Sequence, residues 1–155
     1  MPIVAVVLGI AGLVPVIVCG LGAIGAGTGA NNMLAALVGY AAVVLSFLGG
    51  LHWGLALHPA TDSRARTWRL GLAVVPALVG WAALLVSLAL WDWLALALLA
   101  AGFIGTMVVE QQAIQRGLAV PAGYLWLRWG LTVVVVAMLI TVLTLRVFGV
   151  RVVVL

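Results

Sequence analysis

Residues 124–147 read YLWLRWGLTVVVVAMLITVLTLRV, an apolar run that carries two charges, Arg128 and Arg146. A helix needs about 20 mostly apolar residues to cross the hydrocarbon core of a bilayer, and this run is long enough to do so. Arg128 lies about one turn inside the run, at a depth where lipid disfavours a charge. The stretch therefore predicts a membrane-spanning helix with an arginine that needs a partner.

Four further segments have the same length and apolar character. They are residues 3–25, 33–57, 70–90 and 93–112, and the breaks between the segments are short. The first segment lacks a positively charged region before its apolar run, which favours a retained helix over a signal peptide. The sequence therefore predicts an all-α membrane protein, a five-transmembrane-helix bundle that forms one integral membrane domain over residues 1–155.

The composition excludes a water-soluble fold. Hydrophobic residues make up 67% of the chain and charged residues 6%, whereas a soluble domain has roughly a quarter of its residues charged. The seven basic residues are all arginines scattered singly between apolar runs, so the formal charge of +4 forms no patch for nucleic acid. We therefore expect a lipid bilayer as the surroundings and no nucleic acid as a partner.

The distribution of the arginines predicts an orientation. Five of the seven lie in or near the second and fourth connections between the segments, and two lie toward the opposite end. Because arginine is enriched on the cytoplasmic side of a membrane, we predict a cytoplasmic N-terminus and a periplasmic C-terminus in a bacterial inner membrane. The first group is Arg64, Arg66, Arg69, Arg116 and Arg128, and the second is Arg146 and Arg151.

Three ionisable residues lie within the predicted spans. His52, Glu110 and Arg128 come from different segments, and the alternating directions of the segments bring them to a similar depth on the cytoplasmic side. An ionised group in hydrocarbon costs about 3 kcal/mol, so such groups usually face the bundle interior and pair. We predict a Glu110–Arg128 ion pair with His52 nearby; the alternative is that Arg128 snorkels to lipid phosphates while Glu110 reaches interfacial water. The residues that can complete the hydrogen bonding are Tyr124, Gln111 and Gln112.

Glycines recur in the second segment. Gly50 and Gly54 form a small-xxx-small pair, with Ser46 one turn earlier, which allows close helix packing. The same space can instead admit a flat ligand, and the two interpretations remain open. Residues 20–25 (GLGAIG) match the dinucleotide fingerprint, but no acidic residue follows about 20 positions later, so helix packing is the favoured interpretation there.

Two prolines and one further charge pair carry structural predictions. Pro15 and Pro76 lie inside the first and third segments, and each is expected to kink its helix by removing a backbone hydrogen bond. At the external surface, Asp92 is expected to pair with Arg146 as a structural clasp.

The sequence lacks the known catalytic and metal-binding patterns. It has two histidines, His52 and His58, which are on different faces of a helix, and one cysteine, Cys19. A haem ligated from two helices would need Met107 as a second axial ligand. We therefore expect no catalytic residue, no metal site and no cofactor.

Several stretches together resemble a known family. They are Leu45–Ala56 (LSFLGGLHWGLA), Leu72–Trp81 (LAVVPALVGW), Leu127–Thr132 (LRWGLT) and Leu8–Pro15 (LGIAGLVP). This combination resembles the domain-of-unknown-function family 3429, a transmembrane protein 69-like family. The resemblance implies a small polytopic protein of bacterial inner or mitochondrial membranes and brings no catalytic residue. The sequence departs from the pattern at Ala122-Gly123-Tyr124, where the family implies an aromatic pair.

The candidate site combines the family motif with the charged cluster. The positions that match the motif are Ser46, Gly49, Gly50, His52, Trp53, Gly54 and Arg128, and the cluster adds Glu110. The leading hypothesis is an accessory or assembly component of a larger membrane complex, through a membrane-complex partner or a homo-oligomer. The second is a binder or carrier of a small hydrophobic ligand (lipid, quinone or porphyrin) at the cytoplasmic-side cluster. The third is a membrane enzyme that uses Glu110 and His52 as acid and base.

Overall fold

The computed structural model describes residues 3–25, 27–56, 63–89, 91–115 and 123–149, with side chains except those of 55–56 and 63–69. These residues form the α-helices α1 (Ile3–Ala11), α2 (Val14–Ile24), α3 (Ala30–Ala56), α4 (Ser63–Leu88), α5 (Asp92–Gln115) and α6 (Tyr124–Val147). Five stretches of helix are long and apolar enough to cross a membrane, with α1 and α2 together making the first. The predicted all-α, five-span architecture is confirmed.

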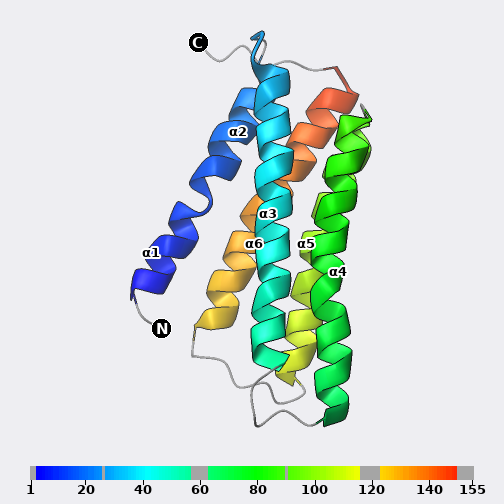
Figure 1. Ribbon diagram of the computed structural model, residues 1–155. Coiled ribbons are helices and arrows are strands. Elements are labelled where there is room, and N and C mark those ends of the chain that lie inside the picture. The colour runs from blue at the N-terminus through cyan, green and yellow to red at the C-terminus, as the bar shows by residue number, and fades with distance from the viewer. Residues whose placement is uncertain (1–2, 26, 57–62, 90, 116–122, 150–155) are drawn as a thin grey trace.

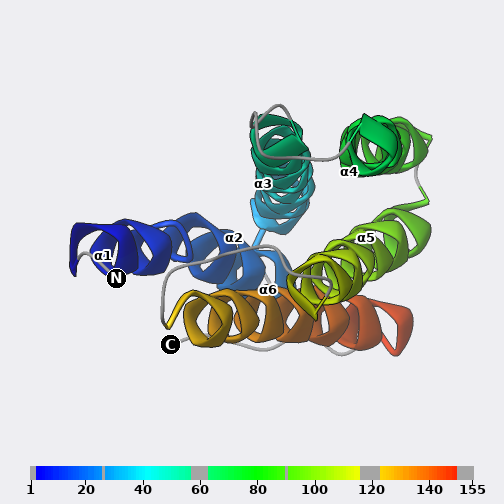
Figure 2. The ribbon, with the colours of Figure 1, turned by 90° about the horizontal axis from the view of Figure 1, so that it is seen from below.

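The five spans stand side by side as a bundle, each antiparallel to the next along the chain, and α1 continues into α2 in the same direction (Figure 1). Each helix from α2 to α5 contacts the next helix along the chain, and α6 contacts α2, so these five helices form a closed ring. Figure 2 shows this ring end-on, and α3 also contacts α5 across it. The first turns of α6 and the last turns of α5 therefore meet at one end of the bundle, where the chain also begins (Figure 1).

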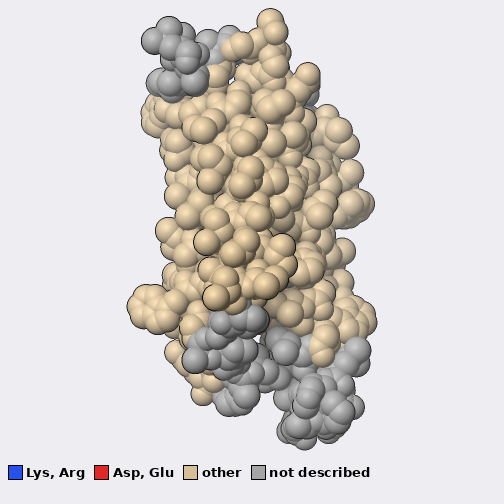
Figure 3. Space-filling view, turned by 90° about the vertical axis from the view of Figure 1, so that its left-hand side faces the viewer, with Lys and Arg blue, Asp and Glu red and all other residues tan. Residues whose placement is uncertain are grey.

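The core of the bundle is apolar and is contributed mainly by α3, α5 and α6. Its largest fully buried side chains include Leu37, Leu45, Leu96, Leu99, Phe103 and Leu139. The outer surface is also apolar, as a lipid-facing surface must be. Figure 3 shows the face covered by α1 and α2, on which the described residues display no gathering of charged side chains.

The first span is broken rather than merely kinked. Gly12 and Leu13 separate α1 from α2, and Pro15 occupies the first turn of α2. Because proline has no N–H to donate and its ring crowds the preceding turn, the helix does not continue through this point. The hydroxyl of Tyr40 on α3 donates a hydrogen bond to the carbonyl oxygen of Gly12 at 2.8 Å. Pro76, in contrast, lies inside the continuous helix α4.

Helices α3 and α4 approach each other closely through glycines. A Cβ added at Gly49 would collide with the carbonyl oxygen of Ala73, and one added at Gly80 would lie 2.9 Å from that of Ala42. Gly50 and Gly54, which the sequence suggested as the packing pair, have open space beside them. That expectation was wrong within this chain, because Gly49 faces α4 and Gly50, one residue on, is turned about 100° away.

The glycines of residues 20–25 serve helix packing, as favoured from the sequence. A Cβ at Gly20 would collide with the side chain of Met138 on α6, and one at Gly22 would lie 2.6 Å from Cγ of Met33 on α3. The pattern therefore lies in the second half of α2, where it lets two neighbouring helices come close.

Candidate functional site

A buried ion pair joins α5 to α6. Glu110 lies in the last two turns of α5 and is 1% exposed, while Arg128 lies in the second turn of α6 and is 7% exposed. The guanidinium Nε of Arg128 donates to Oε2 of Glu110 at 2.8 Å. The pair expected from the sequence is therefore present, and both side chains face the interior of the bundle rather than snorkelling to its surface.

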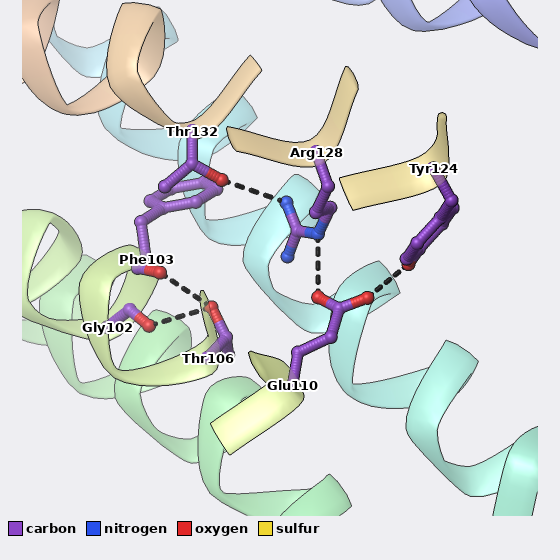
Figure 4. A network of polar contacts seen from close by, with 7 residues as sticks. All are labelled: Gly102, Phe103, Thr106, Glu110, Tyr124, Arg128 and Thr132. Carbon is purple, nitrogen blue, oxygen red and sulfur yellow. Dashed lines mark hydrogen bonds and ion pairs between the residues drawn. The ribbon is translucent and has the colours of Figure 1, made fainter. Parts of the chain in front are cut away.

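Two neighbours on α6 extend the pair into a network (Figure 4). The hydroxyl of Tyr124 donates to Oε1 of Glu110, and Nη1 of Arg128 donates to the Thr132 hydroxyl oxygen at 3.1 Å. Tyr124, Arg128 and Thr132 are spaced four residues apart, so a helix places them on one face. Tyr124 was predicted from the sequence as a hydrogen-bonding partner of the pair, and Thr132 was not, although its four-residue spacing from Arg128 is visible in the sequence.

The network leaves one donor group without a partner. Nη2 of Arg128 is buried and forms no hydrogen bond in the part of the chain that the structure describes. A buried donor that has lost its water and gained no acceptor costs about 1–3 kcal/mol. Arg128 therefore keeps capacity for one more hydrogen-bond acceptor.

Arg128 also lines a cavity of about 260 Å³ between the first span, α3 and α6. Its other lining residues are almost all apolar and include Leu8, Gly12, Val16, Ala41, Val44, Phe47, Phe103 and Val135. Leu8 and Phe47, which stand at its edge, are 67% and 71% exposed on the lipid-facing surface. The cavity is thus an apolar space at the membrane side of the bundle, with the buried residue Arg128 in its wall.

His52 lies elsewhere. It is half-buried and lines a second cavity, of about 320 Å³, together with residues of α4 and α5 such as Pro76, Val79 and Gly105. The depth of His52 along α3 was predicted correctly, but it faces the α4 and α5 side of that helix.

The remaining candidates divide between the interior and the surface. Ser46 donates its hydroxyl to the carbonyl oxygen of Ala42 at 2.8 Å within α3, and Gly49 is buried against α4. Gly50, Trp53 and Gly54 are exposed on the outer face of α3. Neither Gln111 nor Gln112 forms a hydrogen bond to the ion pair among the described residues.

The predicted clasp between Asp92 and Arg146 is wrong. Arg146, in the last turn of α6, donates to the carbonyl oxygens of Ala23 and Ala30 at 3.1–3.3 Å and to Oδ1 of Asn31 at 3.2 Å. Carbonyls at a helix C-terminus lack partners within the helix, so the end of α2 attracts the guanidinium group. Asp92 instead accepts a hydrogen bond from the hydroxyl of Ser87 at 3.0 Å.

Most of the arginines from which the orientation was predicted lie outside the residues and side chains that the structure describes. Arg116 and Arg151 lie outside the described residues, as do the side chains of Arg64, Arg66 and Arg69. The orientation therefore stays a prediction.

The comparisons with known proteins agree with this architecture. Transmembrane protein 69 of Xenopus tropicalis is 38% identical over 81 residues, which are 52% of this chain and 32% of that protein. The chain thus matches about a third of the length of this curated relative. No solved structure matches. A family model described as "Protein of unknown function (DUF3429)" matches residues 1–144, and the chain therefore belongs to this family of membrane proteins.

Proposed function

We propose that this protein binds a small hydrophobic molecule taken from the bilayer, in the cavity lined by Arg128. The observation that carries the proposal is a buried ion pair, Glu110–Arg128, whose arginine lines an apolar cavity and has one guanidinium nitrogen without a hydrogen bond. The ligand then replaces lipid chains in the cavity and meets a polar group at its end.

An ion pair is not an efficient way to stabilise the contact between α5 and α6, if that were its only role. Replacing a buried pair by apolar residues of similar volume is often neutral or stabilising, because desolvation offsets much of the attraction between the charges. Ionisable groups within membrane spans accordingly tend to mark binding or transport sites. The location of Arg128 at a cavity, rather than between tightly packed helices, supports the same interpretation.

Two exposed residues at this cavity support a route of entry for the proposed ligand. Leu8 and Phe47 line the cavity and are exposed, so a lipid-soluble molecule can enter sideways between α1 and α3. Helix α1 has no buried residue, and its packing partner in the bundle is α6. Such a lightly held helix can give way as a ligand passes.

Two neighbouring valines on α3 supply a matched test. Val44 lines the cavity, whereas Val43 is exposed and does not. Val44→Phe should fill the cavity and abolish retention of small molecules during purification in mild detergent, as measured by native mass spectrometry. Val43→Phe adds the same ring on the lipid side and should retain them as the unmodified protein does. Equal retention by the two variants would contradict the proposal.

A second function, as an accessory or assembly component of a larger membrane complex, is favoured by the outer face of α3. Gly50 and Gly54 are exposed there, and a Cβ added to either meets nothing within 4 Å, so another helix can approach closely. Gly50→Leu/Gly54→Leu should separate the protein from its partner in sedimentation in mild detergent. Gly130→Leu, at an equally open glycine on α6, should not. A monodisperse monomer without a co-purifying protein would count against this role.

On the distribution of the arginines, we propose that the N-terminus lies in the cytoplasm. The family resemblance favours a bacterial inner membrane as the location. The ligand cavity would then lie toward the cytoplasmic leaflet. Labelling of cysteines introduced at the two termini with a membrane-impermeant reagent, in intact and in opened cells, tests this orientation.

A further inference from the structure

We propose that the molecule bound beside Arg128 is electrically neutral and carries a hydrogen-bond acceptor, such as a ketone, quinone or ester carbonyl, at one end of an apolar body. An unbonded N–H of the Arg128 guanidinium group donates to that acceptor. This inference rests on the proposed function, since it names the chemistry of the ligand in the same cavity.

Charge balance is the first argument. Arg128 and Glu110 together carry no net charge, and both are almost completely buried. A carboxylate or phosphate placed beside them would add an uncompensated negative charge close to the Glu110 carboxylate. Both the desolvation of that anion and its repulsion by Glu110 would oppose binding in surroundings of low dielectric constant. A neutral acceptor meets neither penalty.

The hydrogen-bonding inventory of the cavity is the second argument. A guanidinium group offers donors and no acceptor, so its partner must accept. Nε is bonded to Glu110 and one N–H of Nη1 is bonded to Thr132, which leaves the second N–H of Nη1 and the two of Nη2. The Tyr40 hydroxyl, also in the cavity wall, already donates to the carbonyl oxygen of Gly12. The polar groups that a ligand can meet in this otherwise apolar space are therefore donors: the unbonded N–H groups of Arg128 and the Thr132 hydroxyl.

The size and lining of the cavity narrow the class further. A volume of about 260 Å³ is at the lower end of small-molecule sites, which suits a single ring or a short chain and not a porphyrin. No histidine, cysteine or methionine is among the described residues that line it, and the Tyr40 hydroxyl is already bonded to the carbonyl oxygen of Gly12, which disfavours axial ligation of haem iron here. Of the ligand types considered from the sequence, a porphyrin is thus the least suited, and a carbonyl-bearing quinone or acyl ester is the best.

The test compares three radiolabelled probes of equal chain length: 2-dodecanone, dodecanoate and dodecane. Each is titrated onto the protein in lipid nanodiscs, with empty nanodiscs subtracted. We expect the ketone to bind about tenfold more tightly than the alkane, because a hydrogen bond to a charged donor contributes about that factor. Dodecanoate should bind no better than the alkane.

Two further measurements separate polar recognition from simple filling of the cavity. The charge-balanced variant Glu110→Gln/Arg128→Gln should bind the ketone and the alkane equally, and Val44→Phe should bind none of the probes. The carbonyl stretching band of the bound ketone should move to lower wavenumber in the unmodified protein, which keeps the test decisive if the double variant does not fold.

The outcomes distinguish the two proposals. If ketone and alkane bind equally and Val44→Phe abolishes both, the cavity is a ligand site but the inferred hydrogen bond is refuted. Tighter binding of dodecanoate than of the ketone overturns the requirement for neutrality. If no probe binds, or if Val44→Phe and Val43→Phe behave alike, both the proposed function and this inference fall.

Discussion

Replacing Arg128 by methionine should strongly destabilise the bundle, because it removes the counter-charge of Glu110. In the structure Glu110 is 1% exposed and accepts hydrogen bonds from Arg128 and Tyr124. After the substitution its carboxylate would keep the Tyr124 hydroxyl but face no positive charge. Leaving one member of a buried pair unpaired costs about 3–5 kcal/mol, and we expect a loss in that range.

The reciprocal and double variants turn this expectation into a thermodynamic cycle. Glu110→Met should cost a similar amount, since Arg128 is 7% exposed and would keep only Thr132 as a partner. The double variant Glu110→Met/Arg128→Met leaves no buried charge and should unfold within about 1 kcal/mol of the unmodified protein. The sum of the single effects should therefore exceed the double effect by several kcal/mol, which marks a direct interaction.

Reversible unfolding by sodium dodecyl sulfate in mixed micelles, followed by circular dichroism, measures all four free energies. Thr132→Val is a graded control: it keeps the pair, preserves the side-chain shape and leaves Nη1 without an acceptor, so it should cost about 1–3 kcal/mol. Single variants that each change stability by less than about 0.5 kcal/mol, with an additive double variant, would refute the reasoning. The two side chains would then be solvated by headgroups or water rather than buried.

Two further predictions concern the packing of α3. Gly49→Ala should destabilise the protein by about 1–3 kcal/mol in the same unfolding assay, because the new methyl group meets the backbone of Ala73. Gly50→Ala, with open space beside it, should be neutral or slightly stabilising. Equal effects of the two substitutions would show that α4 does not pack at Gly49. Tyr40→Phe should lower the free energy of unfolding by about 1 kcal/mol and raise the rate of amide hydrogen exchange around Gly12, because it removes the hydrogen bond to the Gly12 carbonyl oxygen at the helix break. An unchanged exchange rate would show that this hydrogen bond does not stabilise the break.

The spans were predictable because hydropathy and length report directly on the solvent. A bilayer excludes charge and demands about 20 apolar residues, and both requirements are visible in one dimension. The start of α4 was not predictable in this way: α4 begins at Ser63 rather than at residue 70, because a helix can extend beyond the apolar run into the polar flank. The break after Ala11 was underestimated as a kink, since the sequence shows the proline but not the geometry around it.

The candidate site, like the fold, was predictable from the sequence only in part. Sequence position fixes the depth of a residue along its helix, which is why Glu110 and Arg128 could be paired. It does not fix the direction in which a helix faces, and an error of one residue corresponds to about 100° of rotation. For this reason His52 was expected beside the ion pair, whereas it lines the cavity formed with α4 and α5. Close helix packing was likewise expected at Gly50, whereas the structure has it at Gly49.

The two arginines of α6 together limit how that helix can move. Arg128 ties its first turns to α5, and Arg146 ties its last turn to Ala23 and Ala30 at the opposite end of the bundle. The two lie about five turns apart at 3.6 residues per turn, so both project from the same side of the helix. A rotation of α6 about its own axis would withdraw both guanidinium groups at once and break both sets of bonds. Helix α6 is therefore held against rotation at both of its ends.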